Sequence, residues 1–161
     1  FIGLSSAVPT APFLATGKLG QRQREELGRL LTRTGLQRLF RVVLIHHPPV
    51  PQAYKWRKRL VDCEAVSAVI RKAGAELVLH GHTHRLTRNV LTSADGAAIP
   101  VVGLASASSR ESARERAARY SIWSVHRGAD GVFSLSHRSR RYDARSGEIR
   151  ECDDWNPLAG S

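Results

Sequence analysis

The segments VVLIHHPP (residues 42–49) and ELVLHGHTHR (residues 76–85) decide the fold of this chain. In each, a run of successive apolar residues is followed closely by histidines. Continuous hydrophobicity of this kind is typical of strands buried on both faces, as parallel strands in α/β proteins are. Pro48 and Pro49 end the first run, because proline lacks the amide hydrogen that a strand requires. We therefore predict two parallel strands, at residues 42–45 and 76–79.

An amphipathic helix is predicted between these strands. Asp62 is its expected N-cap and Gly74 its C-terminal stop. The apolar residues that recur at helical spacing are Ala65, Val66, Val69, Ile70 and Ala73. A strand, a helix and a second parallel strand form a crossover that brings the C-terminal ends of both strands to one edge of the sheet. The histidines that follow the strands, His46–His47 and His82–His84, are therefore expected to meet there.

The rest of the chain indicates further α/β structure. A short strand is predicted at Phe1–Ser5, and a helix from Gly20 to Thr34-Gly35 with Leu27, Leu30 and Leu31 on its apolar face. After Arg85 the pattern is β-rich, and a second sheet is expected. Its predicted strands are Thr87–Leu91, Ile99–Leu104, Tyr120–His126 and Val132–Ser136. We expect one domain, or part of one, through residue 151, and a tail at 152–161 that frays.

The composition narrows the class of protein. The 161 residues carry a formal net charge of +11, with 25 lysines and arginines against 14 acidic residues. No apolar run approaches the roughly 20 residues that span a bilayer, so no membrane span is expected. Cys63 and Cys152 have no metal-site or disulfide-motif spacing, and we expect a reduced, cytoplasmic protein. The basic run at residues 137–145 is interpreted as a solvated edge, although a positive field also attracts anionic substrates.

His82 and His84 form the first candidate metal site. They lie two residues apart after a predicted strand, and in an extended segment such side chains point to the same side. Gly81 before them is expected to permit a turn that a side chain would obstruct. Imidazole suits zinc, manganese and iron. A lone His-x-His pair is often structural, but His46 is predicted to arrive at the same edge, which favours a metal site.

The two motifs together resemble the calcineurin-like metallophosphoesterases. Within that family they resemble both the cyclic nucleotide phosphodiesterases and the pyrophosphatases of nucleotides and lipid head groups, which the sequence does not separate. VVLIHHPP matches that family's His-x-Pro segment, and ELVLHGHTHR matches its Gly-His-x-His segment. The resemblance covers nearly the whole chain and implies a hydrolase of phosphodiesters or phosphomonoesters. The implied fold is the C-terminal half of a four-layer α/β/β/α sandwich with two mixed β-sheets.

The resemblance also implies a ligand set. His46 and His82 would bind one ion of a pair of divalent metals (manganese, iron or zinc), and His84 the other, with hydrolysis by a metal-bound hydroxide. The family's remaining motifs, which supply the bridging aspartate and an asparagine ligand, do not occur here. Two cations a few ångströms apart need anionic charge between them. We therefore expect the N-terminal half of the same domain to be a partner, and this chain alone to be inactive.

Residues beside these ligands are candidates for substrate contact. His47 is a possible catalytic residue, although side-chain alternation predicts that it faces away from His46 and is hydrogen-bonded within the protein. In the loop QAYKWRKRL, Arg57 and Arg59 are candidate phosphate ligands, and Tyr54 and Trp56 candidate stacking groups for a nucleotide-like phosphate ester. A solvated loop anchored in the core by Trp56 is the alternative.

Two other functions remain open from the sequence. A mononuclear site of three histidines would resemble an open catalytic zinc centre. A non-catalytic basic module that binds nucleic acid would need no metal, and its binding would depend steeply on salt. A half domain also leaves apolar strand faces and edges uncovered, so self-association is expected.

Overall fold

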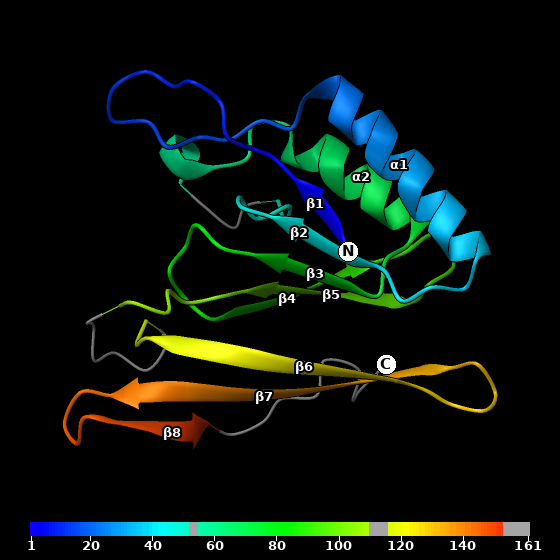
Figure 1. The fold of residues 1–161 in the computed structure, drawn as a ribbon. Coiled ribbons are helices and arrows are strands. Elements are labelled where there is room, and N and C mark those ends of the chain that lie inside the picture. The colour runs from blue at the N-terminus through cyan, green and yellow to red at the C-terminus, as the bar shows by residue number, and fades with distance from the viewer. Residues whose placement is uncertain (52–54, 110–115, 153–161) are drawn as a thin grey trace. The chain divides into compact units, whose positions relative to one another are not determined.

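The structure, a computed structural model, describes residues 1–51, 55–109 and 116–152 (Figure 1). The chain divides into two compact units. The first comprises Phe1–His82 and Arg88–Gly103, and the second Thr83–Thr87 and the residues from Leu104 onward. The first holds a five-stranded sheet and the second a three-stranded sheet. The prediction of an α/β chain with two sheets is confirmed. The strands predicted at Thr87–Leu91 and Ile99–Leu104 belong to the first sheet and not to the second, and the second sheet is antiparallel and not mixed.

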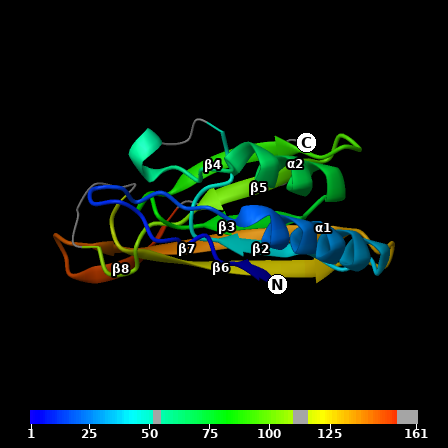
Figure 2. The same cartoon turned by 90° about the horizontal axis from the view of Figure 1, so that it is seen from above.

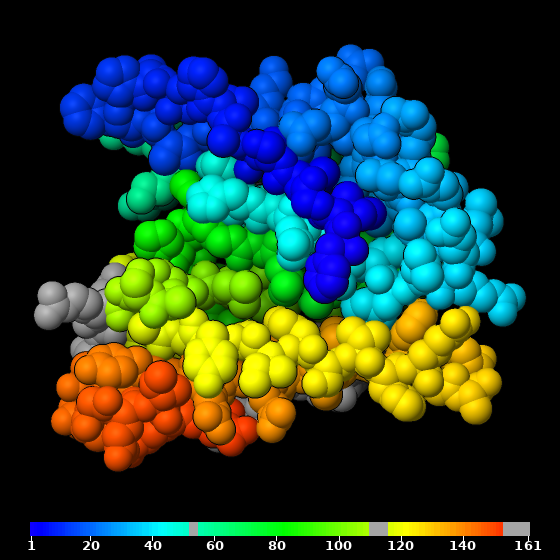
Figure 3. Space-filling model, viewed as in Figure 1, coloured from blue at the N-terminus to red at the C-terminus, as the bar shows by residue number. Residues whose placement is uncertain are grey.

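The strand order of the larger sheet is β1-β2-β3-β5-β4. Its members are β1 (Ile2–Leu4), β2 (Val42–Ile45), β3 (Leu77–His80), β4 (Thr87–Thr92) and β5 (Ala98–Gly103). The strand β1 pairs in parallel with β2, β2 with β3, and β3 with β5. The two strands predicted from the histidine segments are thus adjacent and parallel. The short edge strand β1, dark blue in Figure 3, lies along the surface of this unit.

Two helices cover one face of this sheet, α1 (Gly20–Leu36) and α2 (Cys63–Ala73). They lie side by side across the strands, as Figures 1 and 2 show. Leu27 and Leu31 of α1 and Val66 and Ile70 of α2 are buried against the sheet core, as their helical spacing predicted. Among the described residues, no helix has the length and hydrophobicity needed to cross a bilayer.

Asp62 caps a different helix from the one predicted. It occupies the position before α2, but its side chain makes no cap hydrogen bond there. Its carboxylate instead accepts hydrogen bonds from the backbone amides of Leu19 (3.0 Å) and Gly20 (2.9 Å), where α1 begins. It also forms an ion pair with Arg24. The helix predicted after Asp62 is present, but this carboxylate joins the starts of both helices.

The second unit contains β6 (Arg119–Arg127), β7 (Phe133–Asp143) and β8 (Glu148–Cys152), paired antiparallel in that order. The predicted strand at Val132–Ser136 continues through the basic run, and β8 was not predicted. Cys152, assigned to the tail by the sequence, ends β8; residues 153–161 lie outside the described part. Along β7 the buried positions are Leu135, His137 and Ser139, with exposed residues between them. Because His137 and Ser139 are polar, apolar alternation did not reveal the part of β7 beyond Ser136.

Candidate functional site

Three parallel strands end at one edge of the larger sheet and place the site residues. Leu4, Ile45 and His80 are aligned in register at the ends of β1, β2 and β3. Ser6, His46–His47 and His82 follow those strands directly. The prediction that the two histidine segments meet at one sheet edge is therefore confirmed for His46 and His82.

The rings of His46 and His82 face each other through their nitrogen atoms. His46 Nε2 lies 3.2 Å from His82 Nδ1, with the ring centroids 5.1 Å apart and the planes at 73°. Two nitrogens that bind one tetrahedral zinc ion, each about 2.0–2.1 Å from it, are about 3.3 Å apart. The pair can therefore share either one proton or one divalent ion without a change in its spacing. These two residues fit a shared metal ligand set.

The backbone that carries the second histidine segment is strained. His82 has a φ of 65° and His84 a φ of 52°, in the left-handed region that non-glycine residues seldom adopt. Such conformations cost about 1–3 kcal/mol each and concentrate at functional sites. Gly81, expected to provide the turn, has no positive φ, and a Cβ there would lie at an ordinary 3.5 Å from His46 Nδ1. The unusual conformation thus falls on the histidines themselves.

His47 is buried and lies beside the other two rings. Its ring centroid is 5.1 Å from that of His46 and 4.2 Å from that of His82. The prediction that it faces away from His46 is wrong, because His47 lies beyond the end of β2, where strand alternation no longer applies. The expectation that it is hydrogen-bonded within the protein is confirmed: Nδ1 is 2.8 Å from Ser6 Oγ, and Nε2 is 3.1 Å from the carbonyl oxygen of Ala15.

These contacts define the protonation of His47. A carbonyl oxygen only accepts hydrogen bonds, so Nε2 carries the hydrogen and donates it to Ala15. In the neutral ring Nδ1 then accepts from the Ser6 hydroxyl, while Ser6 Oγ accepts from the backbone amide of His47 (3.3 Å). Burial lowers the pKa of His47, as does the nearby His46, against the opposing effect of the Ala15 hydrogen bond. His47 is thus a neutral ring with both nitrogens engaged by this chain.

The environment also keeps His82 neutral. Burial lowers its pKa to about 4, and the neighbouring His47, His46 and Lys58 act in the same direction, whereas a hydrogen bond with the backbone of Lys58 opposes them. A neutral imidazole offers a nitrogen lone pair to a metal, which a protonated imidazole does not. At neutral pH His82 therefore has the protonation state that metal binding requires.

His84 lies in the segment Thr83–Thr87, which belongs to the second unit. The structure therefore brings together two of the three predicted ligands, His46 and His82, and the role of His84 stays a prediction. Within residues 1–51, 55–109 and 116–152, no group of three or more His, Cys, Asp or Glu side chains is arranged to hold a metal ion.

The cationic loop predicted to contact substrate lies next to His82. It contains the 3₁₀ turn η1 (Trp56–Lys58), and the backbone contact of His82 with Lys58 places this turn at the site. Trp56 is 60% exposed with the guanidinium of Arg57 over its ring, so it does not anchor the loop in the core. The buried anchor is Leu60. Arg59 is exposed like Arg57, and Tyr54 lies outside the described residues.

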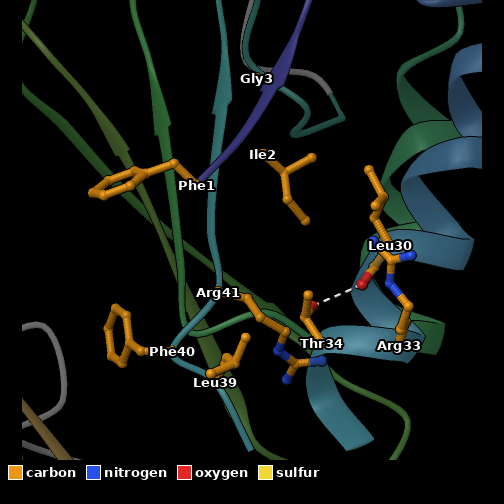
Figure 4. Close-up of a pocket in the computed structure, with 9 residues that line it drawn as sticks. All are labelled: Phe1, Ile2, Gly3, Leu30, Arg33, Thr34, Leu39, Phe40 and Arg41. Carbon is orange, nitrogen blue, oxygen red and sulfur yellow. Dashed lines mark hydrogen bonds between the residues drawn. The ribbon is translucent and has the colours of Figure 1, made fainter. Parts of the chain in front are cut away.

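A pocket of about 360 Å³ lies at the opposite end of the strands (Figure 4). It is formed where β1 and β2 begin, beside the last turns of α1, and Phe1, Leu30 and Leu39 contribute apolar surface. Of the two arginines that line it, Arg41 is already engaged, because it pairs with Glu76 and donates to the carbonyl oxygens of Leu31 and Ala73. This pocket contains none of the predicted site residues.

The sequence did not predict the residues that hold His47. Ser6 could have been found, since it follows β1 at the edge that the histidines share. Ala15 and Gly17 carry no such signal, because they lie in a loop whose path the strand pattern does not determine. A Cβ on Gly17 would lie 2.3 Å from His47 Nδ1, so the absence of a side chain there makes room for the ring.

No family model and no curated protein matches the chain. A solved structure that resembles it is "GAP50 the anchor in the inner membrane complex of Plasmodium", with 12% sequence identity and a TM-score of 0.40. The alignment covers 83% of this chain and 44% of that one, so this chain spans less than half the length of that protein. A likeness of this strength assigns no function.

Proposed function

We propose that this chain supplies part of the metal site of a calcineurin-like metallophosphoesterase. His46 and His82 would hold one divalent ion, manganese, iron or zinc, and His84 a second. The observation that carries the proposal is the 3.2 Å separation of His46 Nε2 and His82 Nδ1, close to the spacing of two ligands on one metal. The strain at His82 and His84 supports it, since backbone strain persists where function requires a geometry.

The proposed substrate is a phosphate ester such as a nucleotide. Arg57 and Arg59 are exposed on the loop that contacts His82 through Lys58, so their guanidinium groups can bind phosphate oxygens in a bidentate manner. The exposed ring of Trp56 offers a stacking surface. Divalent ions at such a site supply charge neutralisation for the phosphoryl group and lower the pKa of water.

The chain's own residues set the conditions for this chemistry. His46 and His82 would fix the position of the first ion, and burial keeps His82 neutral, which is the protonation state in which an imidazole nitrogen can bind a metal. Both nitrogens of His47 are hydrogen-bonded, to Ser6 and Ala15, which favours a supporting role for this residue over the catalytic one that the sequence suggested. Among the residues that the structure describes, no Asp or Glu side chain joins His46 and His82 in a group of three that could hold a metal ion. The proposal therefore assigns the bridging carboxylate to an N-terminal half of a four-layer α/β/β/α domain.

Metal titration of the full chain tests this proposal. Zinc or cobalt binding is measured by calorimetry or by the visible absorption of cobalt, for the wild type and for His46→Ala and His82→Ala. We expect one ion to bind and each substitution to weaken binding at least about 100-fold, since a lost first ligand costs more than an outer partner. The control is His126→Ala, an exposed histidine of β6.

Two outcomes would contradict the proposal. Wild-type affinity in both ligand variants would remove His46 and His82 from the metal site. An equal loss in the His126→Ala control would mean that the metal binds histidines at the surface. Binding of one tight zinc ion that also requires His84 would instead favour a mononuclear three-histidine site.

A further inference from the structure

We infer that Ser6 and His47 are positioning residues that hold the imidazole of His82 in the orientation needed to bind the metal. The inference rests on the proposed function as far as the metal is concerned. The other part of the inference, that the buried and hydrogen-bonded His47 fixes the ring of His82, depends only on contacts within the first unit.

The first step is the immobility of the His47 ring. The ring is held at both nitrogens, by the Ser6 hydroxyl at 2.8 Å and the Ala15 carbonyl at 3.1 Å, and it cannot rotate without losing both bonds. Ser6 and His47 are 1% and 5% exposed, so water does not readily replace either partner. Gly17 packs against one side of the ring at a distance that admits no side chain.

The second step is the contact between His47 and His82. Their ring centroids are 4.2 Å apart with the planes inclined at 37°, which is close packing of one ring on the other. His82 itself lies beyond the last residue of β3, so the sheet hydrogen bonds do not extend to it. The fixed His47 ring therefore limits the rotation of the His82 side chain and keeps Nδ1 directed at His46 Nε2.

The third step connects this arrangement to the cationic loop. The carbonyl oxygen of Ala15 accepts the hydrogen bond from His47 Nε2, and the backbone amide of Ala15 donates a hydrogen bond to the carbonyl oxygen of Arg57 at 2.8 Å. Gly17 likewise pairs with Arg59 and Val61, at 3.0 and 2.8 Å. The segment that holds His47 is thus bonded to the loop that carries the proposed phosphate ligands. The same short segment, residues 15–17, therefore contacts both the His47 ring and the loop that carries the proposed phosphate ligands.

The test is the variant Ser6→Ala in the full chain, with Ser67→Ala as a matched control. Ser67 is also fully buried and hydrogen-bonded, to the carbonyls of Pro49 and Cys63, but it makes no hydrogen bond to a histidine ring. Circular dichroism first verifies that both variants fold. Zinc affinity is then measured by calorimetry, and the imidazole nitrogens are observed by long-range proton–nitrogen NMR without metal.

We expect Ser6→Ala to bind zinc up to about 10-fold more weakly, at or below the low end of the effect of losing a direct partner of a metal-binding histidine, because Ser6 acts on His82 only through His47. Ser67→Ala should stay within about 2-fold of wild type. In wild-type NMR spectra, His47 should be the neutral tautomer with its proton on Nε2. The same spectra should show contacts between the rings of His46 and His82. Those contacts should weaken in Ser6→Ala. The NMR arm requires no metal, so it tests the positioning directly.

The outcomes separate the two proposals. Wild-type zinc affinity in Ser6→Ala, or an equal loss in Ser67→Ala, would overturn the positioning role and leave the metal proposal intact. If the wild type binds no zinc, the metal proposal fails, and the positioning of His82 is decided by whether the ring contacts are lost in Ser6→Ala.

Discussion

At the scale of single residues, the site depends on two features with opposite requirements. His82 and His84 accept a left-handed backbone that costs stability, whereas Gly17 is needed because any side chain would enter the His47 ring. The first is backbone strain at the two histidines, and the second is a steric condition for packing the His47 ring. Substitution distinguishes the two features, because only a side chain added at Gly17 would destabilise the chain by displacing the His47 ring.

Gly17→Ala should destabilise the chain by about 1–3 kcal/mol, the usual cost of overpacking. The new Cβ would meet three atoms of the His47 ring at 2.3–2.7 Å, so the ring or the loop must move. Urea unfolding measures the change. Gly3→Ala is the control, since a Cβ there meets nothing within 4 Å. Equal stability of the two variants would contradict the packing assigned to Gly17.

Convergence of His46 and His82 could be predicted from the sequence because parallel strands with a helical crossover have their C-terminal ends at one edge. The position of His47 could not, because alternation applies only inside a strand and β2 ends at Ile45. The contacts of Ala15 and Gly17 could not either. They arise where the loop that contains Ala15 and Gly17 pairs with the loop at residues 57–61, and such a pairing produces no periodic pattern in the amino-acid sequence.

At the scale of elements, the pattern of apolar residues determined which helices and strands could be predicted from the sequence. The strands β2 and β3 and the helices α1 and α2 bury continuous or helically spaced apolar residues, and all four were predicted. The second half of β7 buries His137 and Ser139, and the described part of β8 buries no side chain fully. Polar residues at inward positions conceal a strand from any analysis based on hydrophobic alternation. Local sequence also did not predict the contacts of Asp62, because the backbone amides that it caps, at Leu19 and Gly20, lie more than 40 residues earlier in the chain.

Asp62→Ala should destabilise the first unit by about 1–3 kcal/mol at neutral pH, because Leu19 and Gly20 lose their acceptor and Arg24 its partner. Burial raises the pKa of Asp62, but the hydrogen bonds from Leu19, Gly20 and Arg24 outweigh it and leave the pKa below the ordinary value. The stabilisation is therefore present above the unfolded pKa of about 3.9 and is lost as the pH falls through the lowered folded pKa.

Urea unfolding at pH 7 and at stepwise lower pH would measure this effect. The difference between wild type and Asp62→Ala should narrow below about pH 4. Glu64→Ala is the matched control, an exposed carboxylate in the first turn of α2, where the helix dipole contributes less than about 1 kcal/mol. A difference that stays constant to low pH would show that Asp62 acts through packing and not through its charge.

At the scale of the whole molecule, a high net charge opposes the association that exposed strand surfaces favour. The strand β6 is an edge of its sheet and is nine residues long, with Ile122 and Val125 43% and 45% exposed. Long edge strands with apolar residues pair readily with other chains. The charge of +11 repels approaching copies, but salt screens this repulsion with a Debye length of about 8 Å at physiological ionic strength.

We therefore predict self-association through β6 that strengthens with salt. Light scattering should give a mass that rises with concentration, and more steeply in 0.15 M than in 0.01 M salt. Val125→Lys should reduce it, because a lysine on an edge strand disfavours strand pairing. Ser134→Lys adds the same charge at an exposed position of the central strand β7 and is the control. A monomer at high concentration in both salts would refute the prediction, and an equal reduction by both lysines would show that net charge, not the β6 edge, governs association.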